Sequence, residues 1–170
     1  AVDYHDYLKM AEELGYNMRE PWILFPKNLK QRHEELIEES REREIKAKED
    51  LDNKKDKKYE QYRKRDSYLE METEQFLLRL PKRIHEIRQE GNAMHHCVAT
   101  YIDRVAKGET TILFLRKKQN PETPFYTMEV NNGAMIQCRA KYNGPMTEEV
   151  KEFVELFQKK KLRSTERKAG

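Results

Sequence analysis

Residues 125–140 read FYTMEVNNGAMIQCRA, two runs of alternating polar and apolar side chains separated by Asn-Asn-Gly. Alternation on both sides of a glycine-containing turn predicts a hairpin of two antiparallel strands. A three-residue loop with Gly133 left-handed places Thr127 opposite Gln137 and separates the two faces cleanly, whereas a two-residue loop would mix them, so we predict the longer loop. The apolar face then carries Tyr126, Met128, Val130, Ala134, Ile136, Cys138 and Ala140. The opposite face carries a polar cluster of Thr127, Glu129, Gln137 and Arg139.

The pattern of residues 73–162 predicts a single α+β domain around this hairpin. Gln75–Leu80 and Thr110–Lys117 have the length and composition of strands, and the second is apolar on both faces, as is typical of a central strand. Gly91 is expected to break the helical pattern, and Asn92 to cap the helix that follows. The expected architecture is a small antiparallel sheet of about four strands, with helices over Met94–Lys107 and Met146–Leu162 on one face.

The segments outside this domain differ from it in composition. Of the 170 residues, 38% are charged, although the net charge is only +3. Residues 27–70 contain neither Gly nor Pro, and repeated acid–base pairs four residues apart predict one long charged helix. A solvated spacer, a weak coiled coil or helix hairpin, and a nucleic-acid-binding arm all remain open for this helix. Residues 1–26 predict an N-terminal helix and a docking segment that buries Trp22, and residues 163–170 a basic tail.

The cysteines and the hydropathy pattern bear on the cellular setting. The sequence has two cysteines, shows no secretory signal and has no apolar run long enough to span a membrane. We therefore expect free thiols, a reducing cytoplasmic location and no membrane partner.

Residues 90–98 read EGNAMHHCV and hold two adjacent imidazoles and one of the two thiols. Thiol chemistry here would use Cys97 as nucleophile, a histidine as base, and Gln137 or Asn143 as donor to an oxyanion. In a helix, however, neighbouring side chains diverge by about 100°, so His96 would point away from Cys97. We predict instead that Cys97 is a mostly buried packing residue. Paired ligands at short spacing are missing from the sequence, so neither a metal nor a cofactor is expected.

Nucleic-acid binding or processing is a further possibility. Phosphates could be contacted by Arg116, Arg139 and Lys141, and bases could stack on Phe125, Tyr126 or Tyr142. His96 with Glu129 could act as acid and base in the cleavage of a phosphodiester. A structural adaptor is the remaining class, and the long charged helix suits it.

One spaced set of residues links these segments: His96-Cys97-Val98, Tyr101, Gly108, Ile112, Arg116, Thr127-Met128-Glu129, Gln137, Arg139 and Asn143. This set resembles the PcfJ-like proteins, which are encoded on conjugative plasmids, phages and related mobile elements. The resemblance covers the main domain best and extends to Tyr4–Leu14 and Leu24–His33. It implies a C-terminal portion of a longer protein, and a genetic context rather than a mechanism. Ala140 stands where the family pattern leads us to expect glycine.

From these patterns we predict one concave site at the sheet, formed by His96, Arg116, Glu129, Gln137 and Asn143. Polar groups in the middle of strands cost stability unless they face solvent or one another, so several of them together indicate a shared site. The candidate catalytic residues are His96, Cys97, Glu129 and Gln137, and the candidate binding residues are Tyr101, Arg116, Thr127, Arg139 and Asn143. The expected function is that of a mobile-element protein acting on or beside nucleic acid. The alternatives are a thiol- or His/Glu-dependent hydrolase or nuclease, and a structural adaptor whose partners are other mobile-element or host proteins.

Overall fold

The computed structural model describes residues 2–162, so the predicted basic tail, 163–170, lies outside the described residues. The chain divides into two compact units, Ala1–Leu51 and Asp52–Gly170. The division falls inside one long helix, α3 (Leu29–Asp66), which contributes residues to both units.

The first unit contains α1 (Tyr4–Glu13), α2 (Pro21–Leu24) and the beginning of α3. Its apolar core comprises Tyr7, Ala11, Leu14, Ile23 and Leu36. Trp22 is 57% exposed, so the prediction that it is buried is wrong. The short helix α2 turns Ile23 inward instead, and Trp22 packs edge-on against Tyr16 with 6.2 Å between the ring centroids.

The second unit is built on a five-stranded antiparallel sheet in which each strand lies beside the next in sequence. The strands are β1 (Met71–Glu72), β2 (Phe76–Arg79), β3 (Thr111–Lys117), β4 (Tyr126–Asn131) and β5 (Ala134–Arg139). The predicted α+β class and the central place of β3 are confirmed. The extra strand is β1, whose two residues are too few to show an alternating pattern.

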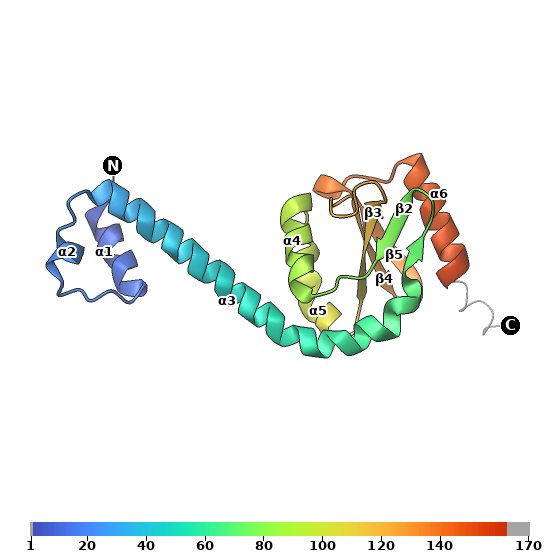
Figure 1. The fold of residues 1–170 in the computed structure, drawn as a ribbon, viewed down its shortest axis with the longest axis horizontal. Helices are drawn as coiled ribbons and strands as arrows, with labels where there is room; N and C mark the ends of the chain where they lie inside the picture. Colours follow the sequence, from blue (N-terminus) through green and yellow to red (C-terminus); the bar gives the residue numbers. More distant parts are fainter. Residues whose placement is uncertain (1, 163–170) are drawn as a thin grey trace. The chain divides into compact units, whose positions relative to one another are not determined.

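Helices cover both faces of this sheet (Figure 1). On one face, α6 (Glu148–Phe157) packs against side chains that include Leu113 and Leu115 of β3. On the other face, α4 (Ile84–Met94) and α5 (Ile102–Ala106) pack against Ile112 and Phe114. The prediction of both helices on one face is therefore wrong. A strand that is apolar on both sides needs a cover on each side.

The β4–β5 hairpin uses a shorter loop than predicted. Asn132 and Gly133 have φ values of 50° and 74° and form the turn between the paired residues Asn131 and Ala134. A bulge follows, so that Val130 pairs with Met135 but Glu129 pairs with Gln137. The predicted register is thus wrong, and Ile136 is 57% exposed rather than in the core. The bulge restores the predicted faces: Thr127, Glu129, Gln137 and Arg139 share one side, and Cys138 is buried on the other.

The segment between α4 and α5 also differs from the prediction. Helix α4 continues through Gly91 and Asn92 and ends after Met94, where His95 adopts φ 50° and ψ 48°. A 3₁₀ turn, η2 (Cys97–Tyr101), then leads into α5. A Cβ at Gly91 would lie 3.2 Å from the carbonyl oxygen of His96. Gly91 therefore permits a close approach of the following chain and does not break the helix.

The second half of α3 is held to the sheet domain by buried polar side chains seven residues apart. Asp52 is fully buried and accepts two hydrogen bonds from Arg88, at 2.8 and 3.0 Å. Tyr59 donates from its hydroxyl to the carbonyl of Pro81 at 2.8 Å, and the Asp66 carboxylate accepts from the Thr111 hydroxyl at 2.8 Å. The solvated-spacer interpretation therefore does not hold for this half of the helix.

Candidate functional site

A small pocket opens to solvent on the sheet face that carries the polar cluster. It is lined by His96, Cys97, Val98, Tyr101, Ile112, Thr127, Met128, Glu129, Gln137, Arg139 and Asn143. The structure thus brings together every predicted site residue except Arg116, from His96 and the following η2, from β4 and β5, and from the turn after β5. Ile112 and Val98 give the pocket apolar walls between the hydrogen-bonding groups.

His96 is placed by the end of α4. Because His95 takes the left-handed conformation, the chain leaves the helix axis, and the backbone N–H of His96 still bonds to the carbonyl of Gly91 at 3.3 Å. The imidazole then lies against β4, with 3.0 Å between its Nε2 and the Oγ1 of Thr127. Burial lowers the pKa of His96, although an interaction of the ring with the residue's own backbone and the nearby Glu90 carboxylate both act in the opposite direction. The ring is therefore neutral near pH 7.

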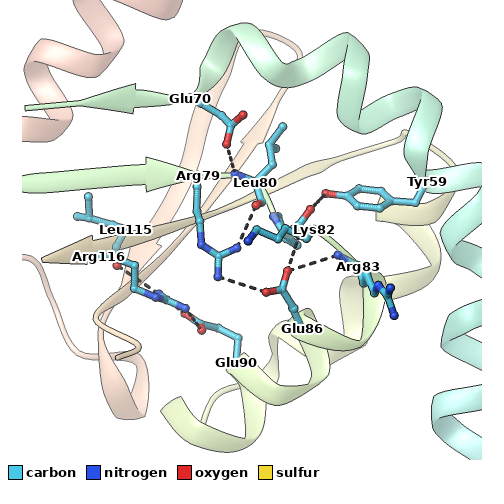
Figure 2. Close-up of polar contacts among 11 residues, drawn as sticks. Tyr59, Glu70, Arg79, Leu80, Lys82, Arg83, Glu86, Glu90, Leu115 and Arg116 are labelled. Atoms are coloured by element: carbon cyan, nitrogen blue, oxygen red, sulfur yellow. Dashed lines mark hydrogen bonds and ion pairs between the residues drawn. The ribbon is translucent and has the colours of Figure 1, made fainter. Parts of the chain in front are cut away.

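Beneath the pocket lies a buried ion pair. Arg116 and Glu90 are 3% and 2% exposed, and two hydrogen bonds of 3.0 and 2.5 Å join the guanidinium to the carboxylate. Figure 2 shows the two side chains facing each other between β3 and α4. Glu90 also accepts a hydrogen bond of 2.9 Å from the hydroxyl of Thr127. Arg116, predicted as a binding residue, is therefore connected to the pocket lining through Glu90 and Thr127.

A second polar network lies on the same face. The Glu129 carboxylate is 4% exposed and accepts hydrogen bonds from the Thr110 hydroxyl at 2.8 Å and from the Gln137 amide at 3.3 Å. The Gln137 amide also donates to the Tyr101 hydroxyl at 3.3 Å. The carboxylate is thus fixed by neutral donors, and it keeps its place without an arginine or lysine partner in these contacts.

The two thiols have opposite environments. Cys138 is buried, and burial raises the pKa of its thiol to about 12, as suits a core residue. Cys97 is exposed and lines the pocket, so the prediction that it is mostly buried is wrong. The prediction assumed an α-helical stripe through Cys97, whereas the helix has already ended at Met94.

Unusual backbone conformations gather beside the pocket. Four non-glycine residues have positive φ among the described residues, and three of them are His95, Tyr142 and Asn143. Asn143 lines the pocket, and the rings of His95 and Tyr142 stack at 4.8 Å with an interplanar angle of 11°. Left-handed conformations at bulky residues cost free energy and cluster at functional sites.

Comparison with known proteins decides the family. The family model described as PcfJ-like protein matches residues 3–154. The chain belongs to the PcfJ-like family. An uncharacterized protein of Listeria innocua serovar 6a, Lin1253/Lin1744, is 30% identical over 151 residues, which cover 88% of this chain and 32% of that protein. This PcfJ-like chain therefore spans about a third of that relative's length. No solved structure matches it.

Other features of the PcfJ-like chain bear on its chemistry. Within residues 2–162, no group of three His, Cys, Asp or Glu side chains could hold a metal ion, and no helix is long and apolar enough to cross a membrane. Sequence reasoning missed Glu90 and Thr110, whose carboxylate and hydroxyl fix the pocket lining. Glu90 is on the last turns of a helix, where an isolated glutamate is usually solvated, so no pattern in the sequence marks it.

Proposed function

We propose that this PcfJ-like chain is part of a mobile-element protein that acts on nucleic acid, and that the pocket contacts a single strand. The proposal is carried by the arrangement of the pocket and its rim. Hydrogen-bonding groups surround apolar walls, and an exposed aromatic stack with two cations lies alongside. Stacking on aromatic rings and contacts to phosphate are the two interactions that single-strand binders combine.

The rim supplies the elements for such contacts. Tyr142 is 69% exposed, its ring is held by the stack with His95, and the Nζ of Lys141 lies 5.5 Å from the ring centroid. Arg139 is an exposed cation that also lines the pocket. A nucleobase could stack on the outer side of Tyr142 while a neighbouring phosphate meets Lys141 or Arg139.

Binding is tested by fluorescence anisotropy with short labelled single-stranded DNA and RNA at salt concentrations between about 50 and 200 mM. We expect the affinity to fall as salt rises. Tyr142→Ala should weaken binding by about 1–3 kcal/mol, the usual contribution of one stacked base. Arg139→Gln should reduce the salt dependence. Tyr68→Ala is the matched control, because Tyr68 is 58% exposed and does not line this pocket. Failure of both nucleic acids to bind, or an equal effect of Tyr68→Ala, would contradict the proposal.

A thiol- or His/Glu-dependent hydrolase is the second candidate. It is favoured by the exposure of Cys97 in the same pocket as His96 and Glu129. We predict that Cys97 reacts with iodoacetamide at neutral pH no faster than an ordinary thiol, and this measurement distinguishes the two candidates. Labelling many times faster than a free-thiol standard, lost in His96→Gln, would support the enzyme. If Cys97 labels at an ordinary rate and no nucleic acid binds, the results would support a structural adaptor, with other mobile-element or host proteins as partners.

A further inference from the structure

The two hydrogen bonds of the Thr127 hydroxyl determine which group donates the proton in each. The Thr127 hydroxyl oxygen lies 2.9 Å from the Oε1 of Glu90 and 3.0 Å from the Nε2 of His96. A hydroxyl has one proton to donate and lone pairs to accept with. Glu90 is paired to Arg116 through both carboxylate oxygens, so it is ionised and can only accept. The hydroxyl proton of Thr127 therefore goes to Glu90.

The histidine must then supply the other proton. If Nε2 carried no hydrogen, it would face the lone pairs of the Thr127 oxygen at 3.0 Å with no proton between them. We propose that Glu90 and Arg116, acting through Thr127, are positioning residues that hold His96 in the tautomer protonated at Nε2, which leaves Nδ1 as the basic nitrogen. The tautomer follows from the network and does not depend on what the pocket binds.

The free nitrogen is set apart in the structure. The Nδ1 of His96 is buried and has no hydrogen-bond partner among the described residues. Every other side-chain heteroatom of His96, Thr127 and Glu90 has one, whereas the Nε of Arg116 in the same network also lacks a partner within residues 2–162. An acceptor that is shielded from water and unpaired is costly by itself. A donor reaches this lone pair only when the groups that cover Nδ1 move aside, and, resting on the proposed function, that donor would be a ribose hydroxyl or a nucleobase N–H.

Burial keeps the ring neutral against the surrounding charges. Glu90 approaches His96 from α4 and would favour a second proton, but Arg116 on β3 holds that carboxylate, and burial of the imidazole acts against the charged form. Glu129 on β4 and Arg139 on β5 carry opposite charges along the same pocket. A neutral ring with one fixed proton can accept a proton at Nδ1, as a general base requires.

The test is a long-range ¹H–¹⁵N correlation spectrum of the chain with ¹⁵N-labelled histidine, near pH 7 and without nucleic acid. We expect His96 to show a protonated, pyrrole-type Nε2 and an unprotonated, pyridine-type Nδ1. Thr127→Val removes the acceptor while keeping the shape, so both tautomers should become populated. Thr127→Ser keeps the hydroxyl and should restore the wild-type pattern. A proton on Nδ1 in the wild-type chain, or a Thr127→Val spectrum identical to wild type, would overturn the proposal.

Two further measurements test the tautomer of His96 separately from the proposed binding of nucleic acid. If Thr127→Val does not fold, the wild-type and Thr127→Ser spectra still decide the tautomer. Adding single-stranded oligonucleotide should shift the Nδ1 resonance of His96. A correct tautomer without any such shift would support the positioning network and contradict nucleic acid as the ligand.

Discussion

Single side chains on the pocket face behave unlike those of an ordinary solvated sheet. Glu129 and Thr127 are 4% and 6% exposed, yet each is satisfied by hydrogen bonds to specific neighbours. Buried polar groups that are fully bonded rigidify their surroundings, and loss of one partner leaves an uncompensated group. The chemistry of each residue here therefore depends on its neighbours.

The protonation of His96 should be visible in the pH dependence of stability. Burial lowers its pKa below the ordinary value of 6.5. Above that pH neither the folded nor the unfolded chain carries the proton. As pH falls from about 6.5 through the folded pKa, the unfolded chain binds a proton that the folded chain resists, so the free energy of unfolding decreases. His96→Gln should remove this part of the decrease in urea unfolding measured at about pH 7 and pH 5. The exposed His5→Gln is the control, and an unchanged pH dependence in His96→Gln would contradict the burial effect.

The Arg116–Glu90 pair should respond very differently to single and double substitution. Arg116→Met leaves the Glu90 carboxylate buried without its partner, which should cost about 3–5 kcal/mol in urea unfolding. Glu90→Leu combined with Arg116→Met removes both charges and should recover much of that loss. If the double variant is as unstable as the sum of the two single variants, the residues do not act as a pair.

Some of these residues could be predicted from the sequence and others could not. Glu129 and Gln137 were predictable as neighbours because strand alternation places them on one face. The exposure of Cys97 depends on where α4 ends, and that is set by the left-handed conformation of His95. Histidine is enriched in this conformation, but the preference is too weak to predict where the helix ends. Glu90 depends on a partner in β3, 26 residues later, that local pattern does not reveal.

At the scale of elements, the hairpin shows why register is harder to predict than faces. A three-residue loop, and a two-residue loop followed by a bulge, satisfy the same alternation of Thr127, Glu129, Gln137 and Arg139. The sequence therefore predicts the faces and leaves the pairing open. The presence of helices on both sides of β3 was foreseeable from its two apolar faces, although we predicted a single helical layer.

The bulge leads to a test by deletion. Ile136 is the additional residue of β5, so its removal should leave a regular two-residue hairpin in which Glu129 still pairs with Gln137. We expect the deletion variant to keep the wild-type cross-strand NOE contacts between Met128 and Cys138. Deleting Gln137 instead gives a chain of the same length with isoleucine opposite Glu129, which should lose pocket function. A changed β4–β5 pairing after removal of Ile136 would contradict the bulge.

At the scale of the whole molecule, one covalently continuous helix contributes residues to an apolar cluster in each of the two units. Leu36 of α3 is part of the apolar core of the first unit, and Tyr59 of the same helix is part of an apolar cluster of the second unit. The sequence predicted the helix from its charge pattern, but it could not predict which turns are buried. The contacts in its second half are largely polar, through Asp52 and Asp66.

A substitution in the first core should therefore leave the second largely unaffected. Leu36 is fully buried, and Leu36→Ala should destabilise the first unit by about 2–5 kcal/mol. We expect faster amide hydrogen exchange in α1 and unchanged exchange in β3 and β4. Ile37→Ala is a matched control, because Ile37 is adjacent but 37% exposed. Equal loss of protection in the sheet would show that the two units unfold together.

The order of the sheet has a consequence for how quickly its parts assemble. Each strand pairs with the next along the chain, so most pairings close short loops, and the β4–β5 hairpin closes the shortest turn. The β2–β3 pairing is the exception, because the chain between Arg79 and Thr111 includes α4, η2 and α5. We expect this closure to limit the refolding rate. The segment that carries His96 then docks on the sheet late in folding. Folding φ-values measured by stopped flow should accordingly be high in the hairpin and low in α4.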